Sequence, residues 1–366
     1  MSNSTSYKKN NITLTKTRQN KLCVSHPFIV SSQLLTAQAR SCHQNNKALQ
    51  MENKDIRIAR YTPQHKELWD SFVDKSRNGT FLHKRGYMEY HSDRFDDHSL
   101  MFFKNGLLAA ILPAHISNGV FGTHCGLTYG GLLIDNDTTA TETLEMFRLL
   151  TTHLKEETDA KEIIYRPVPH IYHRYPCEEE LYALFRYKAT LTERKISSAI
   201  RLDDPLPFKG RRKLTAATKS RLSIVEDDNF AAFWEVLGDR LENKYGVAPV
   251  HNLQEIELLH NRFPKNIKLF RVTDGHNNTL AGSVLYITEN VVHAQYTGSS
   301  HEGRRIGALD HLYSHLIRRQ YAHMQYFDFG ISVEDGGWYL NEGLIGQKEG
   351  FGGRAVMYDT YKLTIE

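Results

Sequence analysis

The sequence predicts an α/β fold of the α+β kind, in which two tandem units each hold a mixed, mostly antiparallel sheet flanked by helices. The chain has 366 residues, 40% of them hydrophobic, which is enough for two cores of about 150 residues each. Strand-like and helix-like runs alternate in the same order in both halves. Three strand-like runs follow one another in the second half, which favours an antiparallel meander.

The first 50 residues differ in composition from the rest of the chain. They hold seven Lys and Arg and no Asp or Glu, so the remaining chain has 39 basic and 42 acidic residues and a formal charge of −3. The net basic charge of the whole chain therefore does not indicate DNA binding by the folded part. We expect residues 1–50 to be a disordered basic extension, with a transit peptide as the alternative.

The first predicted domain covers residues 51–194. A strand at 56–61 precedes Thr62 and Pro63, which are typical residue types for a helix start. Asn105 and Gly106 join two apolar runs, and this dipeptide predicts a hairpin turn. The other expected elements are helices at 64–75, 140–157 and 177–188 and a strand at 161–166.

The second predicted domain covers residues 195–366 and repeats this order. Its expected strands lie at 197–202, 222–226, 267–274, 280–288, 291–298 and 325–330. Its expected helical segments lie at 207–222, 228–245 and 306–323, and a further helix and a final strand follow between 341 and 363. A helix, a strand meander, then a loop and helix before another strand is similar to the order of a Gcn5-related N-acyltransferase (GNAT) domain.

A basic cluster opens the second domain. It contains six basic residues and no acidic one: Lys209, Arg211, Arg212, Lys213, Lys219 and Arg221. The cluster is either a solvated helix face or a binding surface for an anionic partner such as a pyrophosphate or a nucleic-acid backbone. Helical spacing would place Arg212 and Lys219 on one side.

The loop at 299–305 opens a predicted helix, whose N-terminus is a natural phosphate site. Proteins that use acetyl-coenzyme A favour Arg/Gln-x-x-Gly-x-Gly/Ala at this position. Arg304 and Gly307 fit that pattern, whereas Leu309 occupies its last small position. The segment is therefore either a binding site for the phosphates of a carrier or an ordinary helix start.

Two polar residues near the C-terminus are the candidate catalytic groups. Asp328 ends a buried strand, where a carboxylate either bonds loop N–H groups or orients an attacking amine. Lys348 precedes a Gly-rich turn, where it is either a helix C-terminal charge or a group that faces an oxyanion or a phosphate. The glycines of the turn let the backbone approach a ligand closely, and its N–H groups are expected to help stabilise an oxyanion.

Composition sets limits on other site types. The four cysteines, Cys23, Cys42, Cys125 and Cys177, lack the spacing of a zinc site or a disulfide framework. The 19 histidines include no pair with a partner at metal-ligand spacing, so no metal is expected. No apolar run reaches the roughly 18 residues that a membrane span needs. We expect a cytoplasmic protein without a membrane span.

Four segments resemble the Fem peptidyltransferases, which add amino acids to peptidoglycan precursors from aminoacyl-tRNA. The sequence LTYGGLLID lies in the first domain, and RRKLTAATKSRLSI, YFDFGIS and GLIGQKEGFGG follow in the second. They resemble the family motifs in the same order, and the FemAB-like proteins of the GNAT superfamily are the most similar branch. The resemblance covers about residues 51–363.

The resemblance implies two GNAT-like domains, no metal, and acyl transfer to an amine. It implies that Lys348 holds the acyl-transfer site, with Asp328 beside it. The residues it implies for substrate binding are Arg212, Lys219, Tyr296, Gly330, Gly350, Phe351 and Gly352, and those for the phosphates of the carrier are Arg304 and Gly307. Gln347, Ile331 and the pair Gly130 and Gly131 depart from the family pattern. These departures limit the prediction to acyl transfer and do not extend it to cell-wall peptide synthesis.

The predicted function is transfer of an acyl or aminoacyl group from an activated carrier to an amine. The expected co-substrate is acyl-coenzyme A or aminoacyl-tRNA, and no tightly bound cofactor is expected. The acceptor is a small molecule or a cell-envelope precursor such as a nucleotide sugar. Two alternatives remain: an aminoacyl-tRNA-dependent peptidyltransferase of peptidoglycan bridge synthesis, and a catalytically silent module that binds a nucleotide sugar or a protein partner.

Overall fold

Two sheets organise the part of the chain that this computed structural model describes, residues 55–365. The expected extension at 1–50, with Cys23 and Cys42, lies outside the described residues. The smaller sheet is antiparallel and has the order β1-β2-β3-β6. Its strands are β1 (Ile56–Arg60), β2 (Leu100–Lys104), β3 (Leu107–Leu112) and β6 (Leu133–Ile134). The hairpin predicted at Asn105 and Gly106 joins β2 to β3, with both residues at positive φ.

The larger sheet has ten strands in the order β4-β5-β7-β16-β8-β13-β12-β11-β10-β9. In that order their bounds are His115–Ser117, Val120–Gly122, Glu162–Tyr165, Arg354–Thr364, Thr190–Arg201, Tyr326–Ile331, Val291–Ser299, Thr279–Ile287, Ile267–Thr273 and Ser223–Asp227. Among the described strands, only the pairs β5/β7 and β12/β13 are parallel. A mixed, mostly antiparallel sheet flanked by helices confirms the predicted fold class.

The two predicted domains share this sheet. Strand β16, from the C-terminus, pairs with β7 of the first half on one side and with β8 on the other. The predicted boundary between residues 194 and 195 falls inside β8. The division into two domains therefore stays a prediction.

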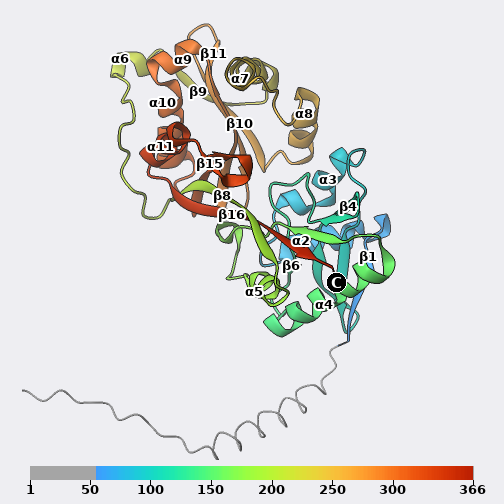
Figure 1. Cartoon of the computed structure of the whole chain (residues 1–366). Helices are drawn as coiled ribbons and strands as arrows, with labels where there is room; N and C mark the ends of the chain where they lie inside the picture. The colour runs from blue at the N-terminus through green and yellow to red at the C-terminus, as the bar shows by residue number, and fades with distance from the viewer. Residues whose placement is uncertain (1–54, 366) are drawn as a thin grey trace, which may run out of the picture. The chain divides into compact units, whose positions relative to one another are not determined.

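Helices cover both faces of the larger sheet in the second half of the chain (Figure 1). On one face α7 (Phe230–Tyr245) and α8 (Leu253–Arg262) pack against β10 to β12. On the other face α10 (Ala308–His315) packs against the alternate residues of the same strands, because successive strand residues point to opposite faces. The remaining helices are α2 (Lys66–Lys75), α3 (Arg85–Met88), α4 (Ala140–Glu157), α5 (Glu179–Arg186), α6 (Ala216–Lys219), α9 (His301–Ile306) and α11 (Glu342–Gly350).

Short elements complete the fold. Five 3₁₀ turns span Pro63–His65, Phe81–His83, Glu89–His91, His170–Tyr172 and Asp335–Gly337 within the described residues, and a π-helical turn spans Leu316–Gln320. Strands β14 (Val333–Glu334) and β15 (Tyr339–Leu340) form a small hairpin. No helix in the described range is both long enough and apolar enough to cross a membrane.

Helix α4 shows how local sequence sets these elements. Thr139 caps it by accepting a hydrogen bond from the backbone of Glu142, while the Glu142 side chain accepts one from the Thr139 backbone. This reciprocal box satisfies two N–H groups that the first turn leaves unpaired. Met146, Leu150 and Leu154 recur every four residues and are fully buried. The helix therefore has the bounds that the sequence predicts.

Two helix predictions in the second half need correction, and one helix was missed. The basic segment predicted as helical at 207–222 contains only the single turn α6, because its like charges repel one another and Gly210 has a φ of 64°. Arg212 and Lys219 therefore do not share a helix face. The helix predicted at 306–323 breaks at Gly307, whose φ is 82°. Helix α8 was not predicted, although Asn252 and Glu255 form a capping box at its start.

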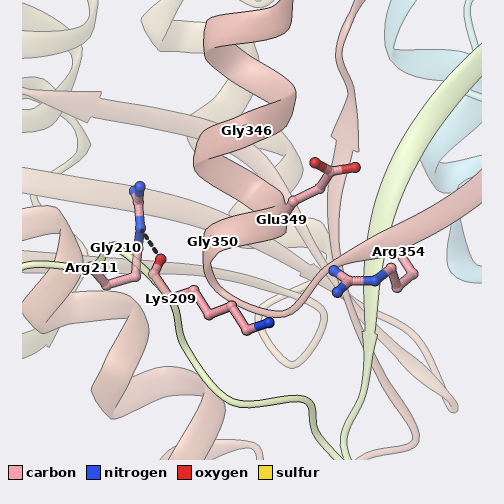
Figure 2. A pocket seen from close by; sticks show the side chains of 7 residues that line it. All are labelled: Lys209, Gly210, Arg211, Gly346, Glu349, Gly350 and Arg354. Carbon is pink, nitrogen blue, oxygen red and sulfur yellow. Dashed lines mark hydrogen bonds between the residues drawn. The ribbon is translucent and has the colours of Figure 1, made fainter. Parts of the chain in front are cut away.

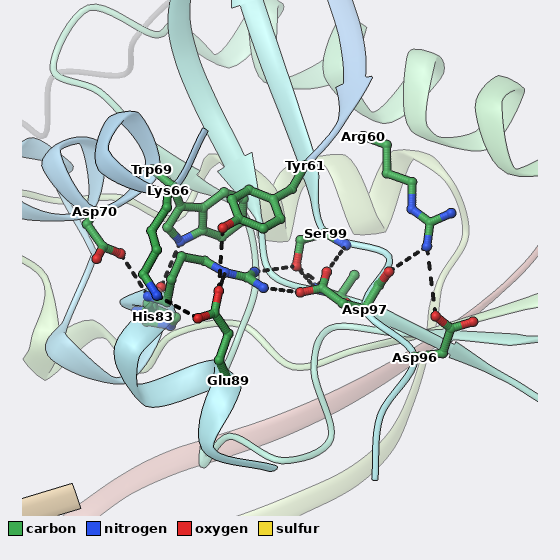
Figure 3. A network of polar contacts seen from close by, with 12 residues as sticks. Arg60, Tyr61, Lys66, Trp69, Asp70, His83, Glu89, Asp96, Asp97 and Ser99 are labelled. Carbon is green, nitrogen blue, oxygen red and sulfur yellow. Dashed lines mark hydrogen bonds and ion pairs between the residues drawn. The ribbon is translucent and has the colours of Figure 1, made fainter. Parts of the chain in front are cut away.

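A network of polar contacts lies in the first half of the chain, and Figure 3 shows Tyr61, Trp69, Glu89 and Asp97 within it. The Arg85 side chain, 3% exposed, forms ion pairs with Glu89 and Asp97. Its guanidinium lies 3.8 Å from the ring centroid of Tyr61 and 5.3 Å from that of Trp69. The two carboxylates and the aromatic faces together offset the desolvation of a buried cation.

Candidate functional site

The parallel strands β12 and β13 separate in the middle of the larger sheet. They pair at only three positions, of which the last joins His293 to Asp328. Strand β12 continues to Ser299, while β13 remains paired with β8 on its other side. On the β11 side Ala294 and Tyr296 have partners in the ladder, whereas Gln295 between them has none and forms a bulge. The strands therefore open just beyond His293 and Asp328.

Two cavities meet at this opening. The larger has a volume of about 860 Å³ and is bordered by α9, α10 and α11. The smaller has a volume of about 480 Å³ and is bordered by β8, β16 and loops of the first half. Ala294, Gln295 and Phe329 line both. The two cavities therefore share a wall at the place where β12 and β13 separate.

Asp328 is fully buried at the bottom of the opening. Its Oδ2 accepts hydrogen bonds from Tyr172 Oη at 2.9 Å and Tyr358 Oη at 2.7 Å, and its Oδ1 accepts one from Ser197 Oγ at 2.5 Å. The backbone N–H of Gly330 also donates to Oδ1. Burial by itself raises the pKa of the carboxyl, but His293 and these donors outweigh burial and hold the pKa far below its usual range. Asp328 is therefore ionised.

His293 is held by this carboxylate. Its Nδ1 lies 2.9 Å from Asp328 Oδ2 and donates to it, since an ionised carboxylate can only accept. This fixes the tautomer and leaves Nε2 without a proton in the neutral ring. The side chain is 12% exposed and lines the smaller cavity. A Cβ on Gly330 would lie 3.2 Å from His293 Cε1, so the predicted site residue Gly330 makes room for the ring.

His293 was not among the predicted site residues. In the sequence it is one of 19 histidines, inside an otherwise ordinary strand. Its position opposite Asp328 depends on the parallel pairing of β12 with β13, and the two residues are 35 positions apart in the sequence. The alternation of strand residues puts His293 on the face opposite to Val292 and Ala294. It does not indicate which residues pack against that face.

Lys348 lines the larger cavity from α11 and is 8% exposed. Its Nζ donates to the carbonyl oxygens of Gly330 at 2.8 Å and Ile331 at 2.6 Å. Burial lowers its pKa to about 8, although the charge of Asp328 opposes part of that shift. Lys348 thus fastens α11 to the end of β13 and has one further N–H.

The Gly-rich turn closes α11. The N–H groups of Phe351 and Gly353 donate to the Lys348 carbonyl, and that of Gly352 donates to the Glu349 carbonyl. They are therefore used within the turn and are not available to an oxyanion, contrary to the expectation from the sequence. Gly350 lets the backbone of Lys209 and the side chain of Arg211 approach. Gly352 adopts a φ of 95°, and Phe351 lies in the core against Phe329.

The residues predicted to bind a carrier line the larger cavity, but not all of their side chains are available to a ligand. Arg304 and Gly307 line the larger cavity, and so does Arg212. The Arg212 guanidinium, however, donates to the carbonyl oxygens of Arg304 and Arg305 at the end of α9. Its backbone N–H donates to Asp310 Oδ2 at 2.8 Å. Arg212 therefore joins the basic segment to α9 and α10.

Tyr296 and Lys219 lie on different parts of the protein. Tyr296 lines the smaller cavity, and its Oη lies 2.5 Å from His251 Nδ1. Burial raises the pKa of this phenol to about 12, so it is neutral. Lys219 is exposed on α6 and borders neither cavity.

A basic hollow adjoins the larger cavity at the C-terminal end of α11 (Figure 2). It has a volume of about 650 Å³, and its charged lining residues are Lys209, Arg211, Arg354 and Glu349. Gly210 and Arg211 line both spaces. Across residues 55–365 no group of three His, Cys, Asp or Glu is arranged to hold a metal ion.

Comparisons with known proteins agree with this architecture. Residues 209–337 match the family described as "Acetyltransferase (GNAT) domain". The crystal structure of FemX is similar with a TM-score of 0.56 and 12% identity, over 83% of this chain and 96% of that one. The structure of L-PGS from Bacillus licheniformis is similar with a TM-score of 0.51 and 12% identity, over 82% and 91%. A comparison with curated proteins finds no match.

At 12% identity the two solved structures show a shared fold, and the family match covers the segment that carries the basic cluster, the meander and Asp328. The chain therefore shares the fold of FemX, and its residues 209–337 are similar to the GNAT acetyltransferase domain.

Proposed function

We propose that this protein is an N-acyltransferase that moves an acyl or aminoacyl group from an activated carrier to an amine. The observation that carries the proposal is the meeting of two cavities at the opening between β12 and β13, beside a buried carboxylate–imidazole pair. The carrier occupies the larger cavity and the acceptor amine occupies the smaller one. The reacting carbonyl lies between them, against Ala294, Gln295 and Phe329.

The chemistry follows from this placement. His293 Nε2 takes a proton from the ammonium of the acceptor, and Asp328 stabilises the resulting imidazolium. The neutral amine attacks the carbonyl carbon, so that a C–N bond forms and the bond from carbon to the sulfur or oxygen of the carrier breaks. The proton held by His293 then passes to the departing thiolate or alkoxide, and the surplus proton on the new amide nitrogen passes to His293 and from there to solvent. Holding both reactants in adjacent cavities makes the attack effectively intramolecular.

Lys348 has a second role in this proposal. Two of its three N–H groups are used on carbonyl oxygens of β13, and the third is available to the larger cavity. A donor at this place would stabilise the oxyanion of the tetrahedral intermediate. The backbone of the bulge residue Gln295 lies in the same opening and is the second candidate donor.

The lining of the larger cavity supports a carrier with phosphates. Arg211, Arg240 and Arg304 border it, and a single carboxylate, Asp310, is among the lining residues. Acyl-coenzyme A has a suitable charge, and we propose a cytoplasmic location, where this carrier is present. The acceptor we propose is a small amine or an amine on a cell-envelope precursor such as a nucleotide sugar.

The basic hollow of Figure 2 supports a second candidate, transfer from aminoacyl-tRNA. Its cations continue the positive surface outside the larger cavity, where a polyphosphate backbone could lie. A filter-binding assay at low salt measures this directly. Binding of tRNA that is lost in a Lys209→Ala, Arg354→Ala double variant would favour this candidate, and absence of binding would eliminate it.

The test of the main proposal begins with mass spectrometry of compounds retained by the purified protein, followed by transfer assays with radiolabelled acetyl-coenzyme A and a panel of amines. The decisive variant is His293→Gln, and the matched control is His276→Gln in an exposed turn. Loss of a general base typically lowers the rate by about 10² to 10⁴-fold. We expect that loss in His293→Gln alone, with an unchanged shift of Tm on adding acetyl-coenzyme A. Full activity of His293→Gln would refute the mechanism, and Tm shifts by nucleotide sugars without any transfer would favour a silent binding module.

A further inference from the structure

Arg166 borders the smaller cavity from the first half of the chain. It follows β7 directly, and two loops hold its backbone: its N–H donates to Thr123 Oγ1 at 2.9 Å, and its carbonyl accepts from the Gly130 N–H at 3.0 Å. The side chain is partly buried and lines the cavity together with His293. The position of Arg166 is thus fixed at the edge of the space that we assign to the acceptor.

The other charged residues of this cavity already have partners. Lys195 Nζ lies 2.7 Å from Glu193 Oε2, and that same oxygen accepts from Thr360 Oγ1. Both oxygens of Asp359 accept from the Arg194 guanidinium, at 2.8 and 2.7 Å. These pairs neutralise the cavity wall formed by β8 and β16.

The Arg166 guanidinium differs from them. Among residues 55–365 it has neither a hydrogen-bond acceptor nor an ion-pair partner for its side chain, and the nearby Glu193 carboxylate is held by Lys195 and Thr360. A partly buried guanidinium without an anion loses part of its hydration without compensation. Its planar donors match a carboxylate or a phosphate in a bidentate manner.

We propose that Arg166 binds an anionic group of the acceptor, so that the acceptor is an amine that also carries a carboxylate or a phosphate. This rests on the proposed function, because it takes the smaller cavity as the acceptor site. The amine end lies at His293 and the anionic end at Arg166, and the two groups together orient the molecule. Neutral amines and simple polyamines of similar size are poor acceptors because they leave the guanidinium unpaired.

The test measures binding to the full chain without carrier, using pairs of probes that differ in the anion. L-Lysine and cadaverine differ by a carboxylate, and glucosamine 6-phosphate and glucosamine differ by a phosphate. Isothermal titration should show at least tenfold tighter binding of the anionic member in one pair, which also tells carboxylate from phosphate. The preference should disappear in Arg166→Met and partly return in Arg166→Lys. Lys161→Met, which removes an exposed charge at the other end of β7, should behave like the wild type.

Two results would overturn this inference: equal affinity for both members of each pair, or an anion preference that Arg166→Met retains. Circular dichroism and thermal unfolding of Arg166→Met confirm that the variant is folded. The His293→Gln variant separates this inference from the proposed function. If it retains transfer activity while Arg166→Met loses the anion preference, the proposed chemistry is wrong and the binding site stands. If His293→Gln loses transfer and Arg166→Met binds all probes as the wild type does, the proposed chemistry stands and the anion-binding role of Arg166 is wrong.

Discussion

His293 and Asp328 face each other across the last paired position of β12 and β13, with Nδ1 2.9 Å from Oδ2. Beyond this position the strands separate and the two cavities meet. The contact therefore lies at the last paired position of the two strands and borders the candidate site. The imidazole and four other groups donate hydrogen bonds to Asp328, and these bonds stabilise a fully buried carboxylate.

Replacing Asp328 by Asn should affect stability and catalysis together. An amide places donor hydrogens against hydroxyl and imidazole donors, and leaving such buried groups unpaired costs about 3 kcal/mol or more. The free energy of unfolding, measured with urea, should fall by about that amount, whereas Tyr172→Phe, which removes one donor, should cost about 1 kcal/mol. In the transfer assay kcat should also fall in Asp328→Asn, because the imidazole loses the carboxylate that holds it. An unchanged kcat would show that Asp328 has only a structural role.

The low pKa of Asp328 also predicts an acid dependence. Because folding depresses this pKa, the carboxylate contributes stability above the unfolded value near 3.8, and that contribution is lost as pH falls toward the folded value. Between pH 5 and pH 3 the wild type should lose more stability than Asp328→Asn does. Urea unfolding at both pH values, compared between the two proteins, measures this difference. A parallel loss in both would contradict it.

Gly330→Ala tests the space beside the imidazole. A Cβ there would lie 3.2 Å from His293 Cε1, and the φ of 75° is unfavourable for alanine by about 1 to 2 kcal/mol. We expect a loss of stability of that size and a larger fall in kcat than in carrier binding, because the ring is displaced. Gly275→Ala is the control, since its Cβ would meet no atom within 4 Å. Wild-type kcat in Gly330→Ala would contradict the assigned position of the base.

The sequence predicted the elements with strong local signals and missed relationships between distant segments. Helix α4 and the hairpin at Asn105 follow from capping and turn residues that lie within a few positions of one another. The basic segment was assigned a helix from its spacing alone, although its repulsion and Gly210 oppose one. Repulsion and glycine act locally, so that error was avoidable.

The site was predicted in part for the same reason. Lys348 and Asp328 lie in segments with a recognisable pattern, and the structure places both at the opening between β12 and β13. His293 and Arg166 lie in ordinary strand sequences, and only the pairing of β12 with β13 and of β7 with β16 brings them to one cavity. Whether a guanidinium has a partner also depends on the packed structure. Such residues could not be identified from one sequence.

Lys348→Met separates the two roles of the lysine. Methionine keeps an unbranched chain but removes the donors to the Gly330 and Ile331 carbonyls, which become unpaired. We expect transfer activity to fall at least tenfold, with binding of the carrier less affected. Lys265→Met, at an exposed position, is the control. Full activity of Lys348→Met on an identified substrate would exclude a role in the reaction.

The pKa of Lys348 gives this variant a second readout. Folding lowers the pKa to about 8, so between pH 8 and the unfolded value of 10.5 the unfolded chain binds more protons. The contribution of Lys348 to the free energy of unfolding therefore rises with pH across that window. The stability difference between the wild type and Lys348→Met should grow in favour of the wild type between pH 7.5 and 10. A difference that is constant over this range would show that the lysine titrates normally.

Glu180 predicts an opposite pH dependence in the first half. This carboxyl is buried on α5, where it accepts hydrogen bonds from the Tyr165 hydroxyl and the Leu132 N–H, and burial raises its pKa to about 7. Between the unfolded value of 4.5 and 7 the folded chain binds more protons, so this group lowers stability as pH rises, by about 3 kcal/mol in total. Glu180→Gln keeps an acceptor oxygen without the charge. It should therefore gain stability relative to the wild type between pH 5 and pH 8, as measured by urea unfolding, whereas Glu178→Gln at an exposed neighbour should not. An equal pH response of Glu180→Gln and the wild type would show that Glu180 is ionised in the folded protein near its ordinary pKa.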